Sequence, residues 1–253
     1  MPATRTSYLL CGTPRTGSTL LCDLLDSTGV AGHPASYFRA PDQEQWAARF
    51  GVPVTQGSLD YGAFVDGAVR EGTTANGVFA ARVMWGTMGA LVGGLDASRS
   101  DRRDTVVLTG RFGPLVMVHL RRRDVVAQAV SWARAEQTGH WQQGDEVSGE
   151  PRLDLAQVDG LVRTIGEHDA AWSDWFLRHD VRPHVVTYED LVTDPRRAVQ
   201  GILDRLEVEL PPGWRPVSAC ARQSDATNEE WIRRYTRWSG RSSPRGRRRG
   251  PRR

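Results

Sequence analysis

Short apolar runs separated by longer amphipathic stretches organise this chain. Four runs, at residues 8–11, 77–84, 115–120 and 184–187, are rich in apolar residues. Such runs are typical of strands that are buried on both faces of a parallel sheet. A weaker fifth run lies at residues 105–108. These runs predict the strands of a mostly parallel sheet.

Helical patterns follow several of the runs. Residues 125–135 follow the third run, and a longer helix is expected over about residues 153–177. Another helix should begin after Asp194, because aspartate is a favoured N-cap and Pro195 suits the first helical position. This alternation of strands and helices predicts an α/β fold with helices on both faces of the sheet.

A glycine-bounded loop joins the first run to the helix that follows it. Gly12 and Gly17 have the spacing of the phosphate-binding loop of nucleotide triphosphatases. That loop continues with a lysine, whereas Ser18 stands there in this chain and the nearest cation is Arg15. A strand, a loop and a helix N-terminus in this order hold phosphate on backbone N–H groups. We therefore expect a P-loop-like three-layer sandwich that binds a phosphate-like group but not the triphosphate of Mg-ATP.

A second cationic cluster follows the third run. Arg121, Arg122 and Arg123 end the expected strand, and Ser131 lies on the helix after it. Guanidinium groups and a hydroxyl suit a second phosphate, and surface salt bridges at a solvated strand end are the alternative. The phosphate interpretation is favoured because ligands bind at the carboxyl ends of parallel strands, where the glycine-bounded loop also lies. Two such sites fit a nucleotide phosphorylated at both ends, such as the sulfuryl donor 3′-phosphoadenosine 5′-phosphosulfate (PAPS).

Six segments, together with a more general motif, carry a resemblance to a known family. The segments are residues 12–21, 29–38, 76–85, 122–132, 137–141 and 222–235. In them, and in register over roughly residues 7–236, the chain resembles the bacterial trehalose 2-sulfotransferase family. The general motif begins at Tyr188-Glu189-Asp190-Leu191 and recurs among sulfotransferases as a whole. The joint occurrence of these segments makes the resemblance specific.

The resemblance implies a donor site for PAPS without a metal. The implied residues are Arg15, Thr16, Gly17, Ser18 and Thr19 at the 5′-phosphosulfate, Arg122 and Ser131 at the 3′-phosphate, and Arg222 and Gln223 near the adenosine. Either neighbour of Arg122 is an alternative for the 3′ contact. Arg15 would also be catalytic, because it stands where many sulfotransferases carry a lysine that stabilises the leaving oxygen.

The acceptor side departs from the family. Ser36 occupies the position of the glutamate that acts as the base in the family, and a neutral hydroxyl accepts protons poorly. His33 is the nearest replacement, with an ordinary pKa of about 6.5. A structural or substrate-contacting His33, with the base at His119, His140 or an unplaced acid, is the alternative.

The resemblance also implies the residues around the acceptor. They are His33, Pro34, Tyr37, Phe38 and Arg39, and the aromatic ones suit an apolar or sugar-stacking wall. The acceptor would be a small molecule with a hydroxyl group, such as a sugar, a glycolipid or a natural product. The family's enzyme forms dimers, so a homodimer is implied as well.

Composition narrows the remaining choices. The chain has no lysine and no apolar run approaching the roughly 20 residues of a membrane span. Its three cysteines lack metal-ligand spacing and suit a reducing, cytoplasmic setting. Residues 239–253 contain seven arginines and no acid, so the net charge of +3 becomes −4 without them. We expect a sulfotransferase domain at 1–238 that binds no nucleic acid, and a disordered tail at 239–253.

The sequence thus predicts an enzyme that moves a sulfuryl group from PAPS to a hydroxyl by in-line displacement. One alternative is a nucleotide-binding homologue without catalysis, for which Ser36 argues. Another is a P-loop small-molecule kinase, against which Ser18 argues. Nucleic-acid binding through the arginine-rich tail is the third.

Overall fold

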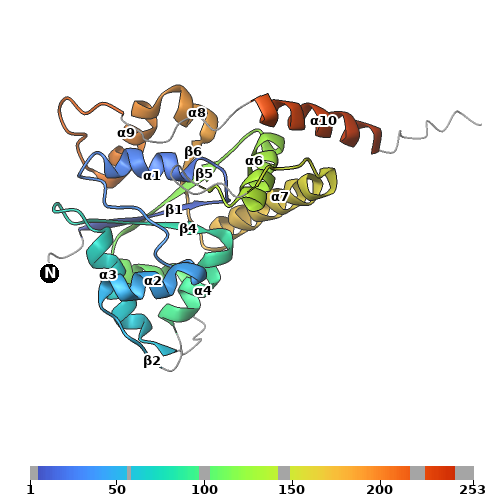
Figure 1. Ribbon diagram of the computed structural model, residues 1–253. Coiled ribbons are helices and arrows are strands. Elements are labelled where there is room, and N and C mark those ends of the chain that lie inside the picture. Colours follow the sequence, from blue (N-terminus) through green and yellow to red (C-terminus); the bar gives the residue numbers. More distant parts are fainter. Residues whose placement is uncertain (1–4, 56–57, 97–102, 142–148, 217–225, 243–253) are drawn as a thin grey trace, which may run out of the picture.

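A four-stranded parallel sheet forms the centre of the molecule. The computed structural model describes residues 5–55, 58–96, 103–141, 149–216 and 226–242. In spatial order, the strands are β4 (Val78–Met84), β1 (Thr6–Gly12), β5 (Leu115–Arg121) and β6 (His184–Thr187) (Figure 1). All three pairings are parallel, as the four apolar runs predict.

Helices cover both faces of this sheet (Figure 1). Their bounds are α1 (Ser18–Asp26), η1 (Ala40–Asp42), α2 (Gln43–Phe50), α3 (Tyr61–Gly72), α4 (Trp85–Leu95), α5 (Asp104–Phe112), α6 (Val125–Thr138), α7 (Leu155–Arg178), α8 (Tyr188–Thr193), α9 (Pro195–Leu206) and α10 (Ala226–Ser242). A short antiparallel pair, β2 (Val54–Thr55) with β3 (Ser58–Leu59), lies apart from the main sheet. The predicted α/β sandwich is confirmed.

The alternation of side chains along β1 creates two hydrophobic cores. Tyr8 and Leu10 point to one face and pack with α1, α8 and α9. Leu9 and Cys11 point to the other face and pack with α2, α3, α4, α5 and α7. All four residues are at most 1% exposed. The continuous apolar run of β1 therefore reflects burial on both faces.

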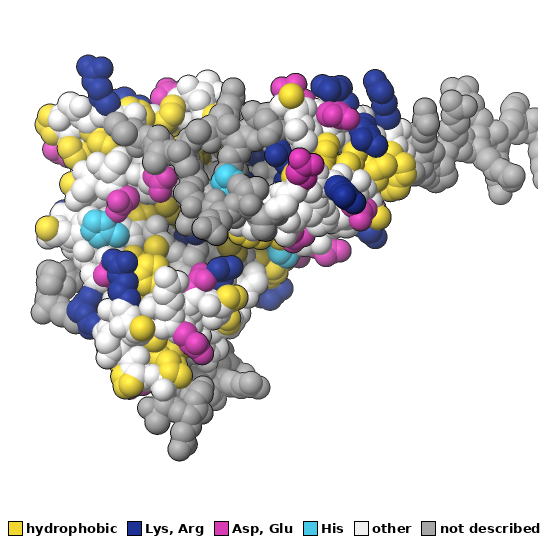
Figure 2. Space-filling view, viewed as in Figure 1, with side chains coloured by type: hydrophobic (Ala, Val, Ile, Leu, Met, Phe, Trp, Pro, Cys, Tyr) yellow, Lys and Arg dark blue, Asp and Glu magenta, His cyan; other side chains and the backbone are white. Residues whose placement is uncertain are grey.

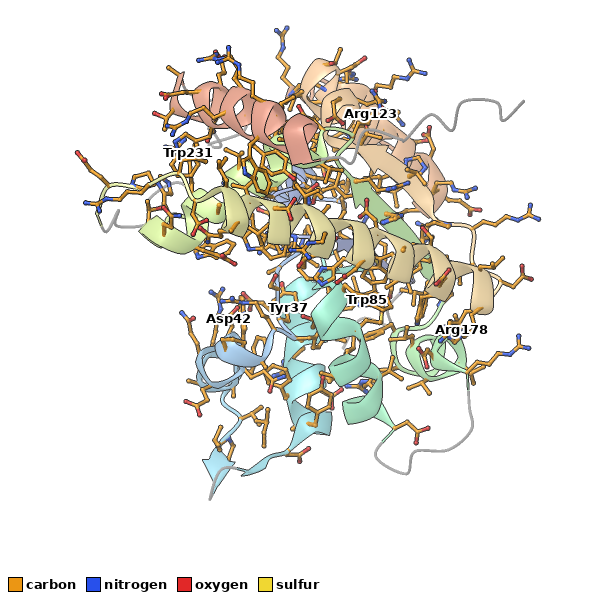
Figure 3. The ribbon with its side chains drawn as sticks, turned by 90° about the vertical axis from the view of Figure 1, so that its right-hand side faces the viewer. Tyr37, Asp42, Trp85, Arg123, Arg178 and Trp231 are labelled. Atoms are coloured by element: carbon orange, nitrogen blue, oxygen red, sulfur yellow. The ribbon has the colours of Figure 1, made fainter. Side chains whose placement is uncertain are left out.

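A third cluster joins α10 to the end of the sandwich. Trp231 and Tyr235 of α10 pack against α6 and α7, and the Tyr235 hydroxyl donates to Asp159 on α7 at 2.9 Å. Figure 3 shows Trp231 on the side of α10 that faces these helices. This packing holds α10 beside the carboxyl ends of the strands.

Two predictions about local structure are wrong. Residues 105–108 belong to helix α5, in which Leu108 and Phe112, four residues apart, both face the core. Trp175 on α7 also donates its indole N–H to Asp104 in the first turn of α5 at 2.7 Å. In the tail, α10 continues to Ser242, so residues 239–242 are helical and not disordered. Residues 243–253 lie outside the described residues.

The other helix predictions are confirmed within a few residues by α6, α7 and α9. Asp194 caps α9 by accepting the N–H of Arg197 at 2.9 Å, and Pro195 is the first helical residue. Across the described ranges, no helix combines the length and apolar composition that a membrane crossing requires.

His119 on β5 is a buried titratable group in the core. Its ring lies 5.1 Å from the ring of Phe176 and 6.3 Å from that of Trp172, and its Nε2 has no hydrogen-bond partner. Burial lowers the pKa of His119 to about 4. The neutral imidazole is therefore the form that the fold accommodates.

This burial predicts a pH dependence of stability. Between the unfolded pKa of about 6.5 and the folded value of about 4, the unfolded chain binds the proton more readily, so stability falls as pH falls through that window. The loss is on the order of 3 kcal/mol. Urea unfolding of His119→Leu should show a flatter dependence than wild type over the same window. If the unfolding free energy of the variant changed with pH as steeply as that of wild type, the lowered pKa of His119 would be contradicted.

Candidate functional site

A cavity of about 1070 Å³ lies at the carboxyl ends of the strands. The loop after β1, Met84 at the end of β4, and Arg122 just after β5 form its inner wall. Residues of η1 and α2 lie on one side, and Asn228 and Ile232 of α10 lie on the other. Ligands of parallel α/β sheets bind at this edge.

Side chains hold four successive carbonyl groups of the loop. The pairs are Trp172 Nε1 with Gly12 O (3.0 Å), Thr16 Oγ1 with Thr13 O (2.9 Å), Gln128 Nε2 with Pro14 O (2.8 Å) and Arg122 Nη1 with Arg15 O (3.3 Å). Each side chain donates a hydrogen bond to a carbonyl oxygen. These oxygens therefore point to protein groups and not to a ligand in the cavity. Thr16 is 1% exposed and acts here as a brace for the loop.

The N-terminus of α1 opens onto the cavity. Gly17 is its N-cap, has a φ of 85° and provides no side-chain cap. The N–H groups of Ser18, Thr19 and Leu20 open the helix, where N–H groups have no partner within the helix. The positive end of the helix dipole adds to them. This combination of loop and helix N-terminus has the geometry that suits a phosphate or sulfate group.

Only Arg122 of the three consecutive arginines lines the cavity. The guanidinium of Arg121 pairs with Asp169 at 3.2 Å, and that of Arg123 pairs with both oxygens of Asp190 at 2.6 Å. The Arg122 guanidinium lies over the Tyr188 ring, with 4.4 Å from Cζ to the ring centroid. Burial lowers the pKa of Arg122, and its Nε has no hydrogen-bond partner.

Arg15 reaches from the loop towards α6. Its φ of 66° is in the left-handed region, and its Nε donates to Ser131 Oγ at 3.0 Å. Its Nη1 also donates to the carbonyl oxygen of Trp141. Arg15, Ser131 and Trp141 all line the cavity. The structure thus brings the loop together with both residues that the resemblance assigns to the 3′-phosphate, Arg122 and Ser131.

Sequence reasoning missed Arg82, which lies in the same cavity on β4. The backbone N–H of Arg82 donates to Ala35 O at 2.9 Å, which places Ser36 beside it. Its Nε donates to Ser36 Oγ at 2.8 Å, and its Nη1 donates to Thr19 Oγ1 at 3.1 Å and to Ser18 Oγ at 3.4 Å. The one sequence feature that could have indicated Arg82 is its place as a single arginine near the carboxyl end of the apolar run 77–84.

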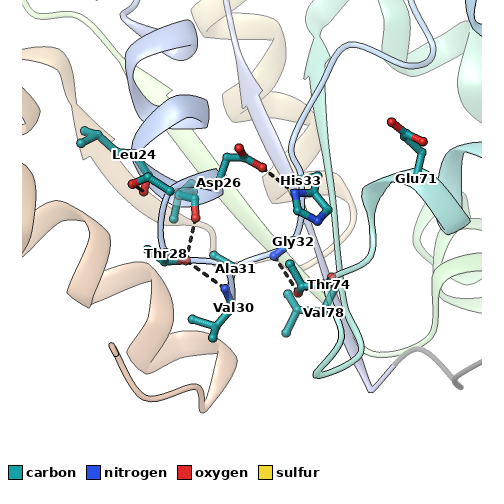
Figure 4. A network of polar contacts seen from close by, with 12 residues as sticks. Leu24, Asp26, Thr28, Val30, Ala31, Gly32, His33, Glu71, Thr74 and Val78 are labelled. Carbon is teal, nitrogen blue, oxygen red and sulfur yellow. Dashed lines mark hydrogen bonds and ion pairs between the residues drawn. The ribbon is translucent and has the colours of Figure 1, made fainter. Parts of the chain in front are cut away.

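His33 lies in a second cavity of about 610 Å³. Its Nδ1 contacts Asp26 Oδ1 at 2.5 Å, as Figure 4 shows, and Pro34 and Glu71 line the same cavity. The two cavities share Ala35, Trp46 and Arg49 as lining residues, but His33 does not line the larger one. The geometry therefore separates His33 from Arg15, Ser18 and Ser36.

The other residues assigned to the acceptor divide between the core and the cavity wall. Tyr37 and Phe38 are each 1% exposed; Tyr37 donates its hydroxyl to His33 O at 2.6 Å and Phe38 packs among core aromatics. The sequence interpretation of Phe38 as part of a cavity wall does not match this core position. Arg39 does line the larger cavity, where both its Nε and Nη2 donate to Asp42 at 2.5 Å.

The remaining predicted residues lie elsewhere. Arg222 and Gln223, expected near the adenosine, lie outside the described residues. His119 is in the core, and neither it nor His140 lines the larger cavity as far as the described residues show. No group of three or more His, Cys, Asp or Glu side chains in the described ranges is placed to hold a metal ion.

Comparisons with known proteins agree on one family. The family model described as Stf0 sulphotransferase matches residues 7–238. A trehalose 2-sulfotransferase of Mycolicibacterium smegmatis is 29% identical over 256 residues, covering 92% of this chain and 95% of that protein. One of Mycobacterium tuberculosis is 28% identical over 254 residues, covering 90% and 93%. The solved sulfotransferase domain from the curacin biosynthetic pathway has the same fold, with a TM-score of 0.52 at 13% identity over 90% of this chain and 82% of that chain.

The close contact between Gly17 and Tyr188 predicts a position-specific effect. A Cβ at Gly17 would lie 2.6 Å from the Tyr188 ring, whereas one at Gly51, with a φ of 70°, would meet nothing within 4 Å. Gly51→Ala should cost about 1–2 kcal/mol for its left-handed backbone. Gly17→Ala adds overpacking and should cost roughly 2–5 kcal/mol. Urea unfolding measures both, and equal losses would contradict the packing described.

Proposed function

Because the chain belongs to the Stf0 sulphotransferase family, we propose that it transfers a sulfuryl group from PAPS to a hydroxyl of a small acceptor. The acceptor would be a sugar, a glycolipid or a natural product, and the reaction would take place in the larger cavity. The chain is a sulfotransferase by family, and the proposal adds the donor and the kind of acceptor. Donor and acceptor would bind in adjoining parts of one cavity. The two parts meet at Ser18, Thr19 and Ser36, which line it together.

The observation that carries the donor proposal is the loop and its fixed carbonyl groups. A loop whose carbonyl oxygens are occupied by side chains presents N–H groups and a helix N-terminus to an anion. The 5′-phosphosulfate of PAPS is such an anion. Thr16, assigned to this contact by resemblance, would support it from behind through its hydrogen bond to Thr13.

Arg122 and Ser131 support a second anion site for the 3′-phosphate. Arg122 is a partly buried cation with no carboxylate partner among the described residues, and it is held over an aromatic ring. A dianionic phosphate would compensate its desolvation by charge-assisted hydrogen bonds. Ser131 lines the same cavity, and its hydroxyl accepts a hydrogen bond from Arg15.

The chemistry that this arrangement supports is an in-line displacement. The acceptor hydroxyl loses its proton, its oxygen forms a bond to sulfur, and the bond between sulfur and the 5′-phosphate oxygen breaks. 3′-Phosphoadenosine 5′-phosphate (PAP) leaves with the electron pair, and the N-terminus of α1 and Arg15 would stabilise the charge that develops on its oxygen. Positioning and charge stabilisation supply most of the catalysis in such transfers.

Calorimetric titration tests the donor directly. PAP is added without magnesium, and ATP is the matched control. The proposal predicts tight binding of PAP and much weaker binding of ATP. Preference for ATP would favour a kinase and overturn the proposal, and binding of neither nucleotide would overturn it as well. Tight PAP binding without sulfation of any acceptor would favour a non-catalytic homologue.

The three arginines provide a prediction with internal controls. PAP and adenosine 5′-monophosphate differ by the 3′-phosphate alone. The Kd of adenosine 5′-monophosphate divided by the Kd of PAP therefore measures recognition of that group. Arg122→Gln should reduce the ratio about 10- to 100-fold, the worth of a hydrogen bond between charged groups. Arg121→Gln and Arg123→Gln should leave it within a few-fold, because their side chains pair with carboxylates. A larger change of this ratio in either control variant would assign the 3′-phosphate contact to that arginine and not to Arg122.

A further inference from the structure

Arg82 lies where the donor-binding loop meets the acceptor part of the cavity. It contacts Ser18 and Thr19 in the first turn of α1 and Ser36 in the segment beside β4. All three partners are hydroxyl groups. A group transferred from the loop to an acceptor beside Ser36 would pass this guanidinium. Arg82 is therefore placed to interact with the reacting acceptor oxygen.

The charges of the acceptor part leave Arg82 without an acidic partner. Arg39 is held by both carboxylate oxygens of Asp42, and Arg49 pairs with Glu71. No carboxylate of the described residues pairs with Arg82, which is partly buried. A partly buried guanidinium lowers the pKa of a hydroxyl bound beside it, because it favours the anionic form. The cavity is thus electrostatically complementary to an anionic oxygen.

Among the described residues of the cavity wall, no carboxylate or imidazole is left unpaired to act as a base. Asp42 is the one carboxylate of this wall, already bonded by Arg39, and the described lining contains no histidine. An aliphatic hydroxyl needs a base to remove its proton during attack. A phenolic hydroxyl, with an ordinary pKa near 10 in tyrosine, ionises far more readily and needs no strong base beside a cation.

We propose that the acceptor is a phenol, and that Arg82 is the catalytic residue that holds its oxygen as the phenolate. The inference rests on the proposed function and narrows its acceptor, from a sugar, glycolipid or natural product, to a natural product that carries a phenol. Trp46 and Trp141 line the cavity, and Trp141 is 43% exposed, so indole surface is available for packing an aryl ring.

The reaction balances without another reactant. The phenol gives its proton to solvent as it ionises beside Arg82. A lone pair of the phenolate oxygen forms the bond to sulfur, and the sulfur–oxygen bond to the 5′-phosphate breaks with its electron pair on PAP. The products are an aryl sulfate and PAP, and no atom changes oxidation state.

Matched acceptors test the class. With PAPS as donor, p-nitrophenol, 4-methylphenol, 4-methylcyclohexanol and trehalose are compared, and sulfated products are measured by mass spectrometry. Both phenols should be sulfated, with kcat/KM at least about 100-fold above the alicyclic alcohol of the same size and above trehalose. The acidic limb of the pH profile should lie at lower pH for the more acidic p-nitrophenol.

Variants of Arg82 test its role. Arg82→Gln should lower kcat/KM for 4-methylphenol about 100-fold and move the acidic limb to higher pH, because the cation that favours the phenolate is lost. Arg82→Lys should recover much of both effects. The Kd for PAP should stay within a few-fold in each variant. Arg111→Gln, whose side chain pairs with Asp66 on the surface away from the cavity, is the control for loss of an arginine.

The outcomes separate this inference from the proposed function. Tight PAP binding with sulfation of 4-methylcyclohexanol or trehalose, or with no sulfation of phenols, would overturn the phenol class and leave the donor site intact. Loss of PAP affinity in Arg82→Gln without a shifted pH profile would assign Arg82 to the donor and overturn its role. Failure of wild type to bind PAP would overturn both.

Discussion

The rest of the site depends on four hydrogen bonds that hold the carbonyl groups of the loop between β1 and α1. The donors come from Trp172 on α7, Gln128 on α6, Arg122 after β5, and Thr16 in the loop itself. They hold a backbone that includes left-handed φ values at Arg15 and Gly17. Non-glycine residues rarely adopt that region without compensation. Residues from several parts of the sandwich thus fix the loop so that the N-terminus of α1 is accessible to an anion.

The same framework divides the cavity into two parts with different charges. On the proposed donor part, Arg122 contacts an aromatic ring and a backbone carbonyl, which leaves it available to a phosphate. On the acceptor part, carboxylates neutralise Arg39 and Arg49 but not Arg82. On the face seen in Figure 2, basic and acidic side chains are interspersed. Among the described residues of the cavity, Arg82 and Arg122 are thus the cations that no carboxylate pairs with.

Local patterns predicted the fold and the loop, but not the contacts that make the loop a site. Apolar runs buried on both faces predicted β1, β4, β5 and β6, whereas the run at 105–108 was too short to distinguish a strand from a buried helix turn. The brace from Trp172 to Gly12 spans 160 residues, and no local pattern reports it. Arg82 was hidden within a strand, and Phe38 was assigned to the acceptor although its neighbours bury it.

The proposed function requires the N-terminus of α1 to bind the 5′ end of the donor. Backbone amide chemical shifts measured during titration with PAP test it most directly. Binding of the 5′ end at this helix N-terminus should cause large shifts at the amides of Gly17, Ser18 and Thr19 with PAP. The shifts should be small with adenosine 3′-monophosphate, which lacks the 5′ group. Equal shifts with both nucleotides, or shifts confined to the cavity around His33, would contradict it.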